Sequence, residues 1–363
     1  MGSVADLLYL QAAVELAERG LFSCTPNPRV GCVLVRDGAV IGRGAHLRTG
    51  EGHAEANALA DAGGDASGAT AYISLEPCTH TGRTPPCTRA LIAANIRRVV
   101  VAMRDPDPRM SGRGLAELKD AGIRTELRML PEAEALNAGY VLRLREGRPF
   151  VRLKIAQSLD GRTAMASGES RWITGPTARA DVQYWRARSC AVITGSGTVL
   201  ADDPRLTVRD QHYAVDGRLR QPLRVVTDTG LRVPGNAALF DDDAPVLFAH
   251  AANVEPVHPR AGHLVCGEDK VDLTRLLEAL AERGCNEVLV EAGPRLVGAF
   301  LAENLWDEIV LYLAPKLLGS TARPMADLPL ATLSESVQAT IVDCVNIGGD
   351  LRVRLVPQQA SET

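Results

Sequence analysis

Residues with metal-ligand side chains and one carboxylate stand close together in the first half of the chain. His53 and Glu55 belong to a His-Ala-Glu triplet, and Cys78, which follows a proline, precedes Cys87. A tetrahedral zinc ion that keeps one position for water needs three protein ligands, and one imidazole with two thiolates suits this metal. Zinc lowers the pKa of the water, and Glu55 can then carry a proton to a leaving amine. This pattern is the signature of the zinc deaminases.

Each of these residues has an ordinary explanation when taken alone. Free cysteines are usually small buried hydrophobic residues, and a single histidine is usually a surface or core residue. The local context favours ligands, because residues 72–75 read as a strand that ends just before Cys78. Cys87 precedes an apolar helical pattern, and a helix N-terminus favours thiolate over thiol. We therefore predict that His53, Cys78 and Cys87 bind zinc and that Glu55 is the catalytic proton carrier.

The spacer between the two cysteines is longer than in the short deaminase signature. Eight residues separate them, whereas the short signature is Cys-x-x-Cys. His80, Arg83 and Thr84 in this spacer are candidates for binding a phosphate or sugar attached to the base. The alternative is a closed structural zinc site with His80 as fourth ligand, which would leave the nearby carboxylate without a function.

The composition is that of a globular protein with more than one domain. At 363 residues the chain is too long for one typical core, so two or three domains are expected. The net charge is -4 with both signs interspersed, which argues against a nucleic acid as partner. No apolar run is long enough to span a bilayer and the N-terminus lacks the features of a signal peptide, so we expect a cytoplasmic protein without a membrane partner. The eight cysteines are expected to be reduced thiols.

Periodicity and turn residues divide the chain into two α/β halves. In the first half, an Ala- and Leu-rich helix ends at Gly20, and Asp37-Gly38 marks a hairpin between residues 30–35 and 40–44. Helices and strands then alternate and lead into an amphipathic stretch at 132–145. Glycine and proline then interrupt the pattern, so we place the domain boundary between residues 147 and 148. Helices are expected from His53, Thr88 and Leu115, and strands at residues 71, 97–103 and 123–129.

The second half, residues 148–363, alternates in the same way. A strand opens it at 150–156, and a helix at 272–283 ends before Gly284. This alternation predicts a second α/β sheet domain. Further strands are expected at 190–194, 223–227, 244–250, 287–290, 309–313 and 351–355, and further helices at 176–188 and 295–304.

Two glycine-bearing segments, 194–198 and 291–298, follow predicted strands in the second half. Each could present backbone N–H groups to a phosphate. Neither has the glycine spacing of a dinucleotide fingerprint, which disfavours a Rossmann fold and leaves ordinary strand-to-helix turns as the alternative. Charged residues expected at strand ends or in adjacent loops are further candidates, although each is more often a solvated charge: Lys154, Asp160, Arg186, Asp202, Arg209 and Glu291.

Motifs in both halves resemble one family. They are residues 26–31, His53-Ala54-Glu55, residues 75–78, 82–87, 158–164 and 198–209. Together they reach from Pro26 to about Gly319 and resemble the bifunctional riboflavin-biosynthesis deaminase/reductase family, in which the long spacer between the cysteines is usual. The resemblance implies an α/β fold, in which a cytidine-deaminase-like α/β/α layered domain is followed by a dihydrofolate-reductase-like α/β domain.

The resemblance also implies the reaction, zinc and NADPH as cofactors, and a homo-oligomer. Zinc-dependent hydrolytic deamination of 2,5-diamino-6-(5-phosphoribosylamino)pyrimidin-4-one comes first, and NADPH then reduces the ribosyl side chain to ribityl. The implied NADPH site comprises Ala156, Trp172, Thr198, Asp202, Thr229, Gly293, Pro294, Arg295, Leu296, Val297, Gly298 and Ala299. The implied substrate site comprises Ser170, Arg186, Leu206, Arg209 and Glu291. Lys154 and Asp202 are candidates for assisting ring opening or protonation of the sugar.

Three positions depart from the family's usual pattern. Gly52 replaces a common proline, Asn57 follows the His-Ala-Glu triplet, and Ala292 stands where a second glycine is common. None of the three is a ligand or proton carrier, so these changes bear on affinity and not on the reaction class. Two other functions remain open: a deaminase for a different nucleotide with an inactive reductase domain, and a zinc-stabilised scaffold that senses NADPH.

Overall fold

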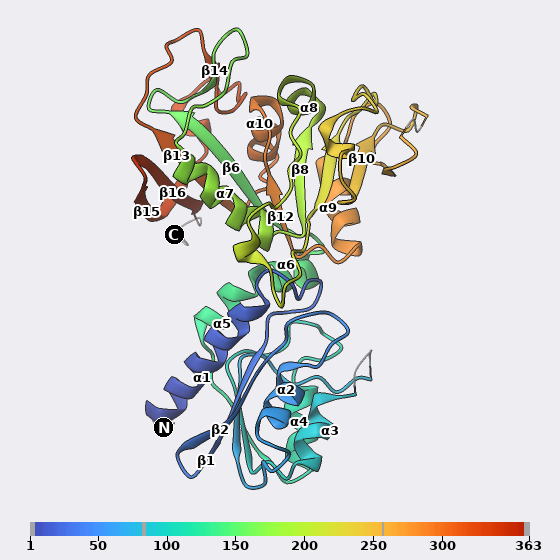
Figure 1. Cartoon of the computed structure of the whole chain (residues 1–363), viewed down its shortest axis with the longest axis vertical. Coiled ribbons are helices and arrows are strands. Elements are labelled where there is room, and N and C mark those ends of the chain that lie inside the picture. The colour runs from blue at the N-terminus through green and yellow to red at the C-terminus, as the bar shows by residue number, and fades with distance from the viewer. Residues whose placement is uncertain (1–3, 82–84, 256–257, 359–363) are drawn as a thin grey trace. The chain divides into compact units, whose positions relative to one another are not determined.

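The computed structural model describes residues 4–81, 85–255 and 258–358 and divides into two compact units (Figure 1). The first unit comprises residues 1–147 together with the short segment 214–218. The second comprises residues 148–213 and 219–363. Each unit is built around one large sheet with helices on both of its faces.

The first unit has a five-stranded sheet in the order β2-β1-β3-β4-β5. Strand β1 is antiparallel to both of its neighbours, β2 and β3, whereas β3, β4 and β5 are parallel to one another. Parallel neighbours place the loops after β3 and β4 at the same edge of the sheet. The strands are β1 (Gly31–Arg36), β2 (Ala39–Ala45), β3 (Thr70–Ile73), β4 (Arg98–Val101) and β5 (Arg124–Leu127).

Helices cover both faces of this sheet, as the predicted α/β/α layering requires. Alternate strand residues point to opposite faces, so Val33 packs against α1 on one face while Cys32 and Leu34 pack on the other. The first face carries α1 (Val4–Ala17), α5 (Pro131–Leu136) and α6 (Ala138–Glu146). The second carries α2 (Ala54–Asp61), α3 (Cys87–Ala93) and α4 (Arg113–Asp120).

Two glycines in β2 bring α2 unusually close to the sheet. A Cβ at Gly44 would lie 2.1 Å from the carbonyl oxygen of Ala54, and one at Gly42 would lie 2.3 Å from that of Ala58. Neither contact is compatible with a side chain, so glycine is needed at both positions. The close packing fixes the start of α2, the helix that carries Glu55.

The amphipathic stretch at 132–145 is two helices and not one. Asn137 separates α5 from α6, and its side chain is bound to the backbone of Arg29. The Asn137 oxygen accepts from Arg29 N at 2.8 Å, and its amide donates to Arg29 O at 2.9 Å. This buried pair of bonds depends on a residue 108 positions away, so the local pattern did not reveal it.

The second unit has a nine-stranded sheet in the order β11-β10-β9-β8-β12-β6-β13-β16-β15. From β11 to β13 all neighbours are parallel, while β16 is antiparallel to β13 and β15. The strands are β6 (Phe150–Ser158), β8 (Ala191–Gly195), β9 (Leu223–Thr227), β10 (Val246–His250), β11 (Gly262–Val265), β12 (Glu287–Val290), β13 (Glu308–Ala314), β15 (Ala339–Ile347) and β16 (Asp350–Pro357).

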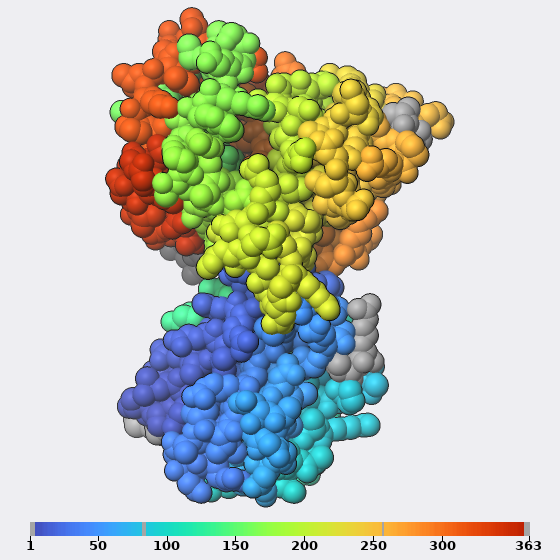
Figure 2. Space-filling view, in the orientation of Figure 1, coloured from blue at the N-terminus to red at the C-terminus, as the bar shows by residue number. Residues whose placement is uncertain are grey.

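Four helices enclose the second sheet. The core on one face joins α9 (Leu273–Glu282) and α10 (Pro294–Ala302), and the core on the other joins α7 (Pro176–Arg188) and α8 (Ser196–Asp202). A separate small sheet pairs β7 (Arg162–Ala164) with β14 (Arg323–Pro324). Figure 2 shows the surface of these two segments, green and orange, lying side by side.

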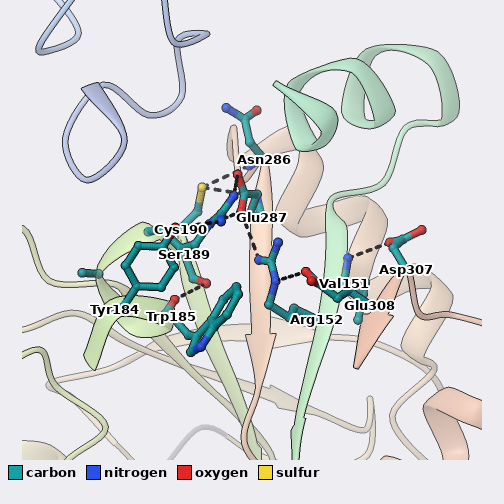
Figure 3. Close-up of polar contacts among 12 residues, drawn as sticks. Val151, Arg152, Tyr184, Trp185, Ser189, Cys190, Asn286, Glu287, Asp307 and Glu308 are labelled. Atoms are coloured by element: carbon teal, nitrogen blue, oxygen red, sulfur yellow. Dashed lines mark hydrogen bonds and ion pairs between the residues drawn. The ribbon is translucent and has the colours of Figure 1, made fainter. Parts of the chain in front are cut away.

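A buried ion network joins β6 to its two neighbours (Figure 3). Arg152 of β6 donates to Glu287 of β12 at 3.0 Å and to Glu308 of β13. Arg188, at the end of α7, also binds Glu287 at 3.0 Å, and Arg354 of β16 binds Glu308 at 2.5 Å. Every charge in this group therefore has an opposite partner, which offsets the cost of burial.

Candidate active sites

The three predicted metal ligands converge in the first unit. His53 caps the N-terminus of α2, Cys78 follows β3, and Cys87 is the first residue of α3. His53 Nδ1 lies 3.2 Å from Cys87 Sγ and 3.6 Å from Cys78 Sγ, and all three ligand atoms lie within 4.8 Å of one another. Zinc bonds of 2.0 to 2.3 Å at tetrahedral angles place two ligand atoms about 3.5 Å apart. The donor set therefore fits a zinc ion in both chemistry and spacing.

The pKa values of the two thiols shift in opposite directions. The hydrogen bond from Cys87 lowers the pKa of Cys78 to about 4, against the raising effect of burial, and His53 lowers it further. The same bond, followed by burial, raises the pKa of Cys87. A lowered pKa favours the thiolate form of Cys78, which is the form that binds metals.

Glu55 lies beside the thiols on the first turn of α2. Its side chain is buried, and burial followed by the negative charge of Cys78 raises the pKa of its carboxyl. A raised pKa brings a carboxyl closer to the range in which it can both accept and donate a proton at neutral pH. This is the property that the predicted proton carrier requires.

The structure places two further residues near this site, His46 and Asp105, which the sequence did not indicate. His46, at the end of β2, is buried, its ring stands at 72° to that of His53, and its Nε2 lies 3.0 Å from the Asn27 amide. Asp105, in the loop after β4, is also buried, and burial raises its pKa to about 6, with contributions from Asp107, Glu76 and Cys78. A lone histidine and an aspartate before a proline carry no local signal for a site. Their proximity appears only when the ends of β2, β3 and β4 meet.

Of the three candidate residues between the two cysteines, the structure describes only His80. His80 is exposed, and its Nδ1 lies 3.4 Å from Met110 Sδ. Within the described part of the chain, the metal-ligand cluster consists of the two cysteines and His53 alone, so a closed site with His80 as fourth ligand is not supported. Arg83 and Thr84 lie outside the described residues.

The second unit brings charged residues together where β6 and β12 lie side by side. Arg186 donates to Glu291 through Nε at 2.5 Å and Nη2 at 3.0 Å, and Lys154 Nζ lies 4.0 Å from the same carboxylate. Burial alone would raise the pKa of Glu291, but Arg186, then Lys154 and Arg209, lowers it. Burial lowers the pKa of Lys154. A basic lysine beside a paired carboxylate is an arrangement that can hold and move protons.

The placement of three charged residues corrects the expectation of strand ends and loops. Arg186 lies in the last turn of α7, Asp202 ends α8, and Lys154 lies within β6. Asp160 does lie in a loop, where its carboxylate accepts from the backbone N–H groups of Leu318 and Gly319. Asp160 therefore holds two loops together and does not join the charged group.

The two glycine-bearing segments adjoin each other. Gly195 caps α8 and Gly293 caps α10, and Gly293 N donates to Thr198 Oγ1 at 3.2 Å. Because the Thr198 oxygen accepts this bond, its own O–H can still donate to a ligand. At Gly298 a Cβ would lie 2.2 Å from the carbonyl oxygen of Asp327, so this glycine serves close packing.

The other implied NADPH and substrate residues differ in exposure and in contacts. Ser170 Oγ donates to Asp202 Oδ1 at 3.1 Å. Trp172 is exposed, with the Arg179 guanidinium 4.3 Å from its ring. Of the rest, Ala156 is half-buried in β6, Leu206 is buried, and Thr229 is exposed after β9.

Comparison with known proteins now decides the family. Residues 4–103 match the cytidine and deoxycytidylate deaminase zinc-binding region, and residues 149–353 match the RibD C-terminal domain. The chain is 48% identical to the riboflavin biosynthesis protein RibD of Escherichia coli over 97% of this chain and 99% of that protein. It belongs to the RibD family. The family members include RibD of Haemophilus influenzae, 43% identical over 98% of both chains.

Solved structures of RibD proteins agree with the whole fold. RibD of Acinetobacter baumannii has a TM-score of 0.92 at 44% identity and covers 98% of this chain and 99% of its own. A deaminase/reductase from Thermotoga maritima has a TM-score of 0.88 at 32% identity, covering 98% of this chain and 99% of its own. The predicted fold class is confirmed, and the chain is a bifunctional deaminase and reductase of riboflavin biosynthesis. Zinc and NADPH are the cofactors of its two domains.

The described helices carry no candidate for a transmembrane segment. None of them is both long enough and apolar enough to cross a bilayer.

Proposed function

We propose that the first unit deaminates 2,5-diamino-6-(5-phosphoribosylamino)pyrimidin-4-one and that the second reduces the ribosyl side chain of the deaminated product. The domains would be residues 1–147 and 148–363. The observation that carries the deaminase proposal is the convergence of His53, Cys78 and Cys87 beside the buried carboxyl of Glu55. The Thermotoga relative is named for both of these activities, which supports this choice of substrate.

His53, Cys78 and Cys87 would hold zinc, which supplies a Lewis acid that activates water. Glu55 would accept a proton from the attacking water and would then donate this proton to the departing amine. Burial and the charge of Cys78 raise the pKa of Glu55, which brings the carboxyl closer to the range in which it can both accept and donate a proton. The buried His46, held by Asn27 and by the Gly52 carbonyl at 3.1 Å, shapes the wall next to His53.

In the second unit, bound NADPH would supply the hydride. Arg186 and Arg209 would bind the substrate phosphate together with Ser170 and Leu206, and Glu291 would hold Arg186 in place. Lys154 is our choice for the group that moves a proton during opening of the sugar ring, because burial lowers its pKa and Glu291 lies 4.0 Å away. Asp202 is instead engaged by Ser170 and would hold the edge of the cofactor site. The remaining NADPH contacts are assigned to Ala156, Trp172, Thr198, Thr229 and residues 293–299.

The decisive experiment supplies the zinc-loaded protein with the diaminopyrimidine ribose phosphate, with and without NADPH, while ammonia and NADPH are followed together. Ammonia should appear in both cases, and NADPH should be consumed only after deamination. Ammonia without NADPH consumption would favour a deaminase with an inactive reductase domain. The absence of both signals would favour a zinc-stabilised scaffold.

We also propose that this enzyme acts in the cytoplasm as a homo-oligomer assembled through β15. This strand ends the nine-stranded sheet and exposes Ile341, Val342 and Val345. An apolar edge strand is a surface for pairing with a second copy of the chain. Light scattering should show a smaller particle for Ile341→Lys combined with Val345→Lys. Val265→Lys, on exposed β11 at the opposite end of the sheet order, is the matched control and should leave the mass unchanged.

A further inference from the structure

One arginine stands beside the glycine-bearing segments without a role in the site as described so far. Arg232 lies in the loop after β9, and its Nη2 donates a 2.8 Å hydrogen bond to Ser196 Oγ in the first turn of α8. The Arg232 side chain is 66% exposed, whereas Ser196 is buried. A buried hydroxyl therefore fixes one end of the guanidinium, while the exposed side chain keeps other N–H donors for a ligand.

The carboxylate next to Arg232 is turned away from solvent. Asp228 follows the last residue of β9 and is fully buried, and its Oδ2 accepts from Val233 N at 2.9 Å. Its Oδ1 lies 3.5 Å from Arg232 Nε. In many dinucleotide sites a carboxylate in such a place binds the ribose 2′-hydroxyl of NAD, whereas an arginine accommodates the 2′-phosphate of NADP. Since Asp228 closes its own loop, the group offered to a ligand here is the cation.

The strand order places the charged group, the glycine-bearing segments and Arg232 one after another along one edge of the sheet. The parallel strands β9, β8, β12 and β6 are neighbours, so their carboxyl ends share one edge of the sheet. Glu291 and its partners lie at β12 and β6. The contact of Gly293 with Thr198 links the segment after β12 to the segment after β8. The contact of Arg232 with Ser196 links the segment after β8 to the segment after β9. Neighbouring strands are about 4.8 Å apart. A dinucleotide with its nicotinamide at the substrate and its phosphates at Gly293 therefore ends with its adenosine ribose near Arg232.

We infer that Arg232, held by Ser196, binds the 2′-phosphate of NADPH and thereby sets the preference for NADPH over NADH. The inference rests on the proposed NADPH-dependent function of the second unit. A guanidinium binds phosphate through parallel charge-assisted hydrogen bonds. NADH carries a neutral hydroxyl at that position and gains no such bonds.

The test measures dissociation constants of the full-length, zinc-loaded protein for NADPH and for NADH by calorimetry. Arg232→Ala should weaken NADPH binding by about 10- to 100-fold, as expected for loss of hydrogen bonds to a charged group, and leave NADH binding unchanged. The isolated fragments 2′,5′-ADP and 5′-AMP should show the same contrast. Arg275→Ala is the matched control, because this arginine on α9 is also 66% exposed and also pairs with a nearby aspartate, Asp272. It should change neither constant.

Arg232→Lys keeps the charge without the planar fork and should fall between the wild type and Arg232→Ala. Equal weakening of NADPH and NADH would overturn the inference, because Arg232 would then contact a part that both cofactors share. Unchanged NADPH binding in Arg232→Ala would overturn it as well. If the wild-type protein itself bound no NADPH, the proposed cofactor would fail and the inference with it.

Discussion

Arg186 and Glu291, 105 residues apart in the chain, are joined by two hydrogen bonds of 2.5 and 3.0 Å. Two residues further along α7, Arg188 binds Glu287, the first residue of β12, at 3.0 Å. The end of α7 is therefore fastened to both ends of one short strand. This double attachment fixes the position of Arg186, which we propose binds the substrate phosphate.

Arg186→Ala should destabilise the protein as well as impair reduction. The change leaves Glu291 buried with Lys154 Nζ 4.0 Å away, and removal of one partner of a buried ion pair costs about 3 kcal/mol. Denaturant unfolding would measure the loss. Arg205→Ala is the control, because its 2.8 Å pair with Asp241 is exposed and should be worth less than about 1 kcal/mol. Similar losses in the two variants would contradict a special role for the buried pair.

The Glu291 carboxylate should also add a pH dependence to stability. Its pKa in the folded protein lies below the ordinary value of 4.5, so its contribution is complete above that pH and is lost as the pH falls through the lower, folded value. The stability advantage of the wild type over Glu291→Gln should therefore shrink on acidification from pH 7 to below 4.5. Unfolding free energies measured across this range provide the check, and a constant difference would refute the expectation.

Glu55→Gln should abolish deamination without loss of zinc. Replacing the proton carrier should slow ammonia release by about 100- to 10,000-fold. Metal analysis should still find zinc at the wild-type level, and NADPH oxidation with deaminated substrate should be unchanged. Glu51→Gln, which alters an exposed carboxylate in the loop before His53, is the control and should retain deamination. Normal ammonia release from Glu55→Gln would disprove the proton-carrier role.

Removal of zinc by a chelator should affect only one of the two reactions. His53, Cys78 and Cys87 all belong to the first unit, so ammonia release should stop while reduction of the deaminated intermediate continues. Calorimetry should also show the unfolding of the first unit at a lower temperature, since a metal bound to the folded state stabilises it. Cys87→Ser should reproduce both effects. Parallel loss of both activities would argue that the metal acts elsewhere.

Asn137→Ala should destabilise the first unit without touching its ligands. The variant loses the bonds to Arg29 N and Arg29 O, and unsatisfied buried backbone groups cost about 1 to 3 kcal/mol. Denaturant midpoints would measure the change, with zinc content as the test of an intact site. A stability equal to that of the wild type would mean that water replaces the side chain.

The sequence predicted those elements whose pattern is local. The strands at 223–227 and 287–290 and the helix at 176–188 agree with β9, β12 and α7, because short apolar runs and a proline start mark them clearly. It missed β15, although Gly348 and Gly349, both with positive φ, form the turn to β16. It named no helix at 196–202, although residues 194–198 were interpreted as a possible strand-to-helix turn, and packing on the sheet produces the short helix α8 there.

The same distinction holds for the active sites. The convergence of the three proposed zinc ligands was predictable because only a few residue types bind zinc and their spacing forms a signature. The sequence named Arg186 and Glu291 as charged candidates, but their pairing was not predictable from spacing, since it depends on where α7 lies on the sheet. His46 and Asp105 carried no signal at all, because strand order alone brings them to the metal ligands.

The ion network around Arg152 (Figure 3) has a consequence for how this protein can change over generations. A substitution of Glu287 or Glu308 strands a positive charge in the interior, whereas exchange of the whole group for apolar residues can be neutral or even favourable. Single substitutions that each preserve stability are therefore not expected to convert the charged group into an apolar one. Natural relatives that have this ion network are therefore expected to retain it. Protein design can replace it, because all of its positions can be changed at once.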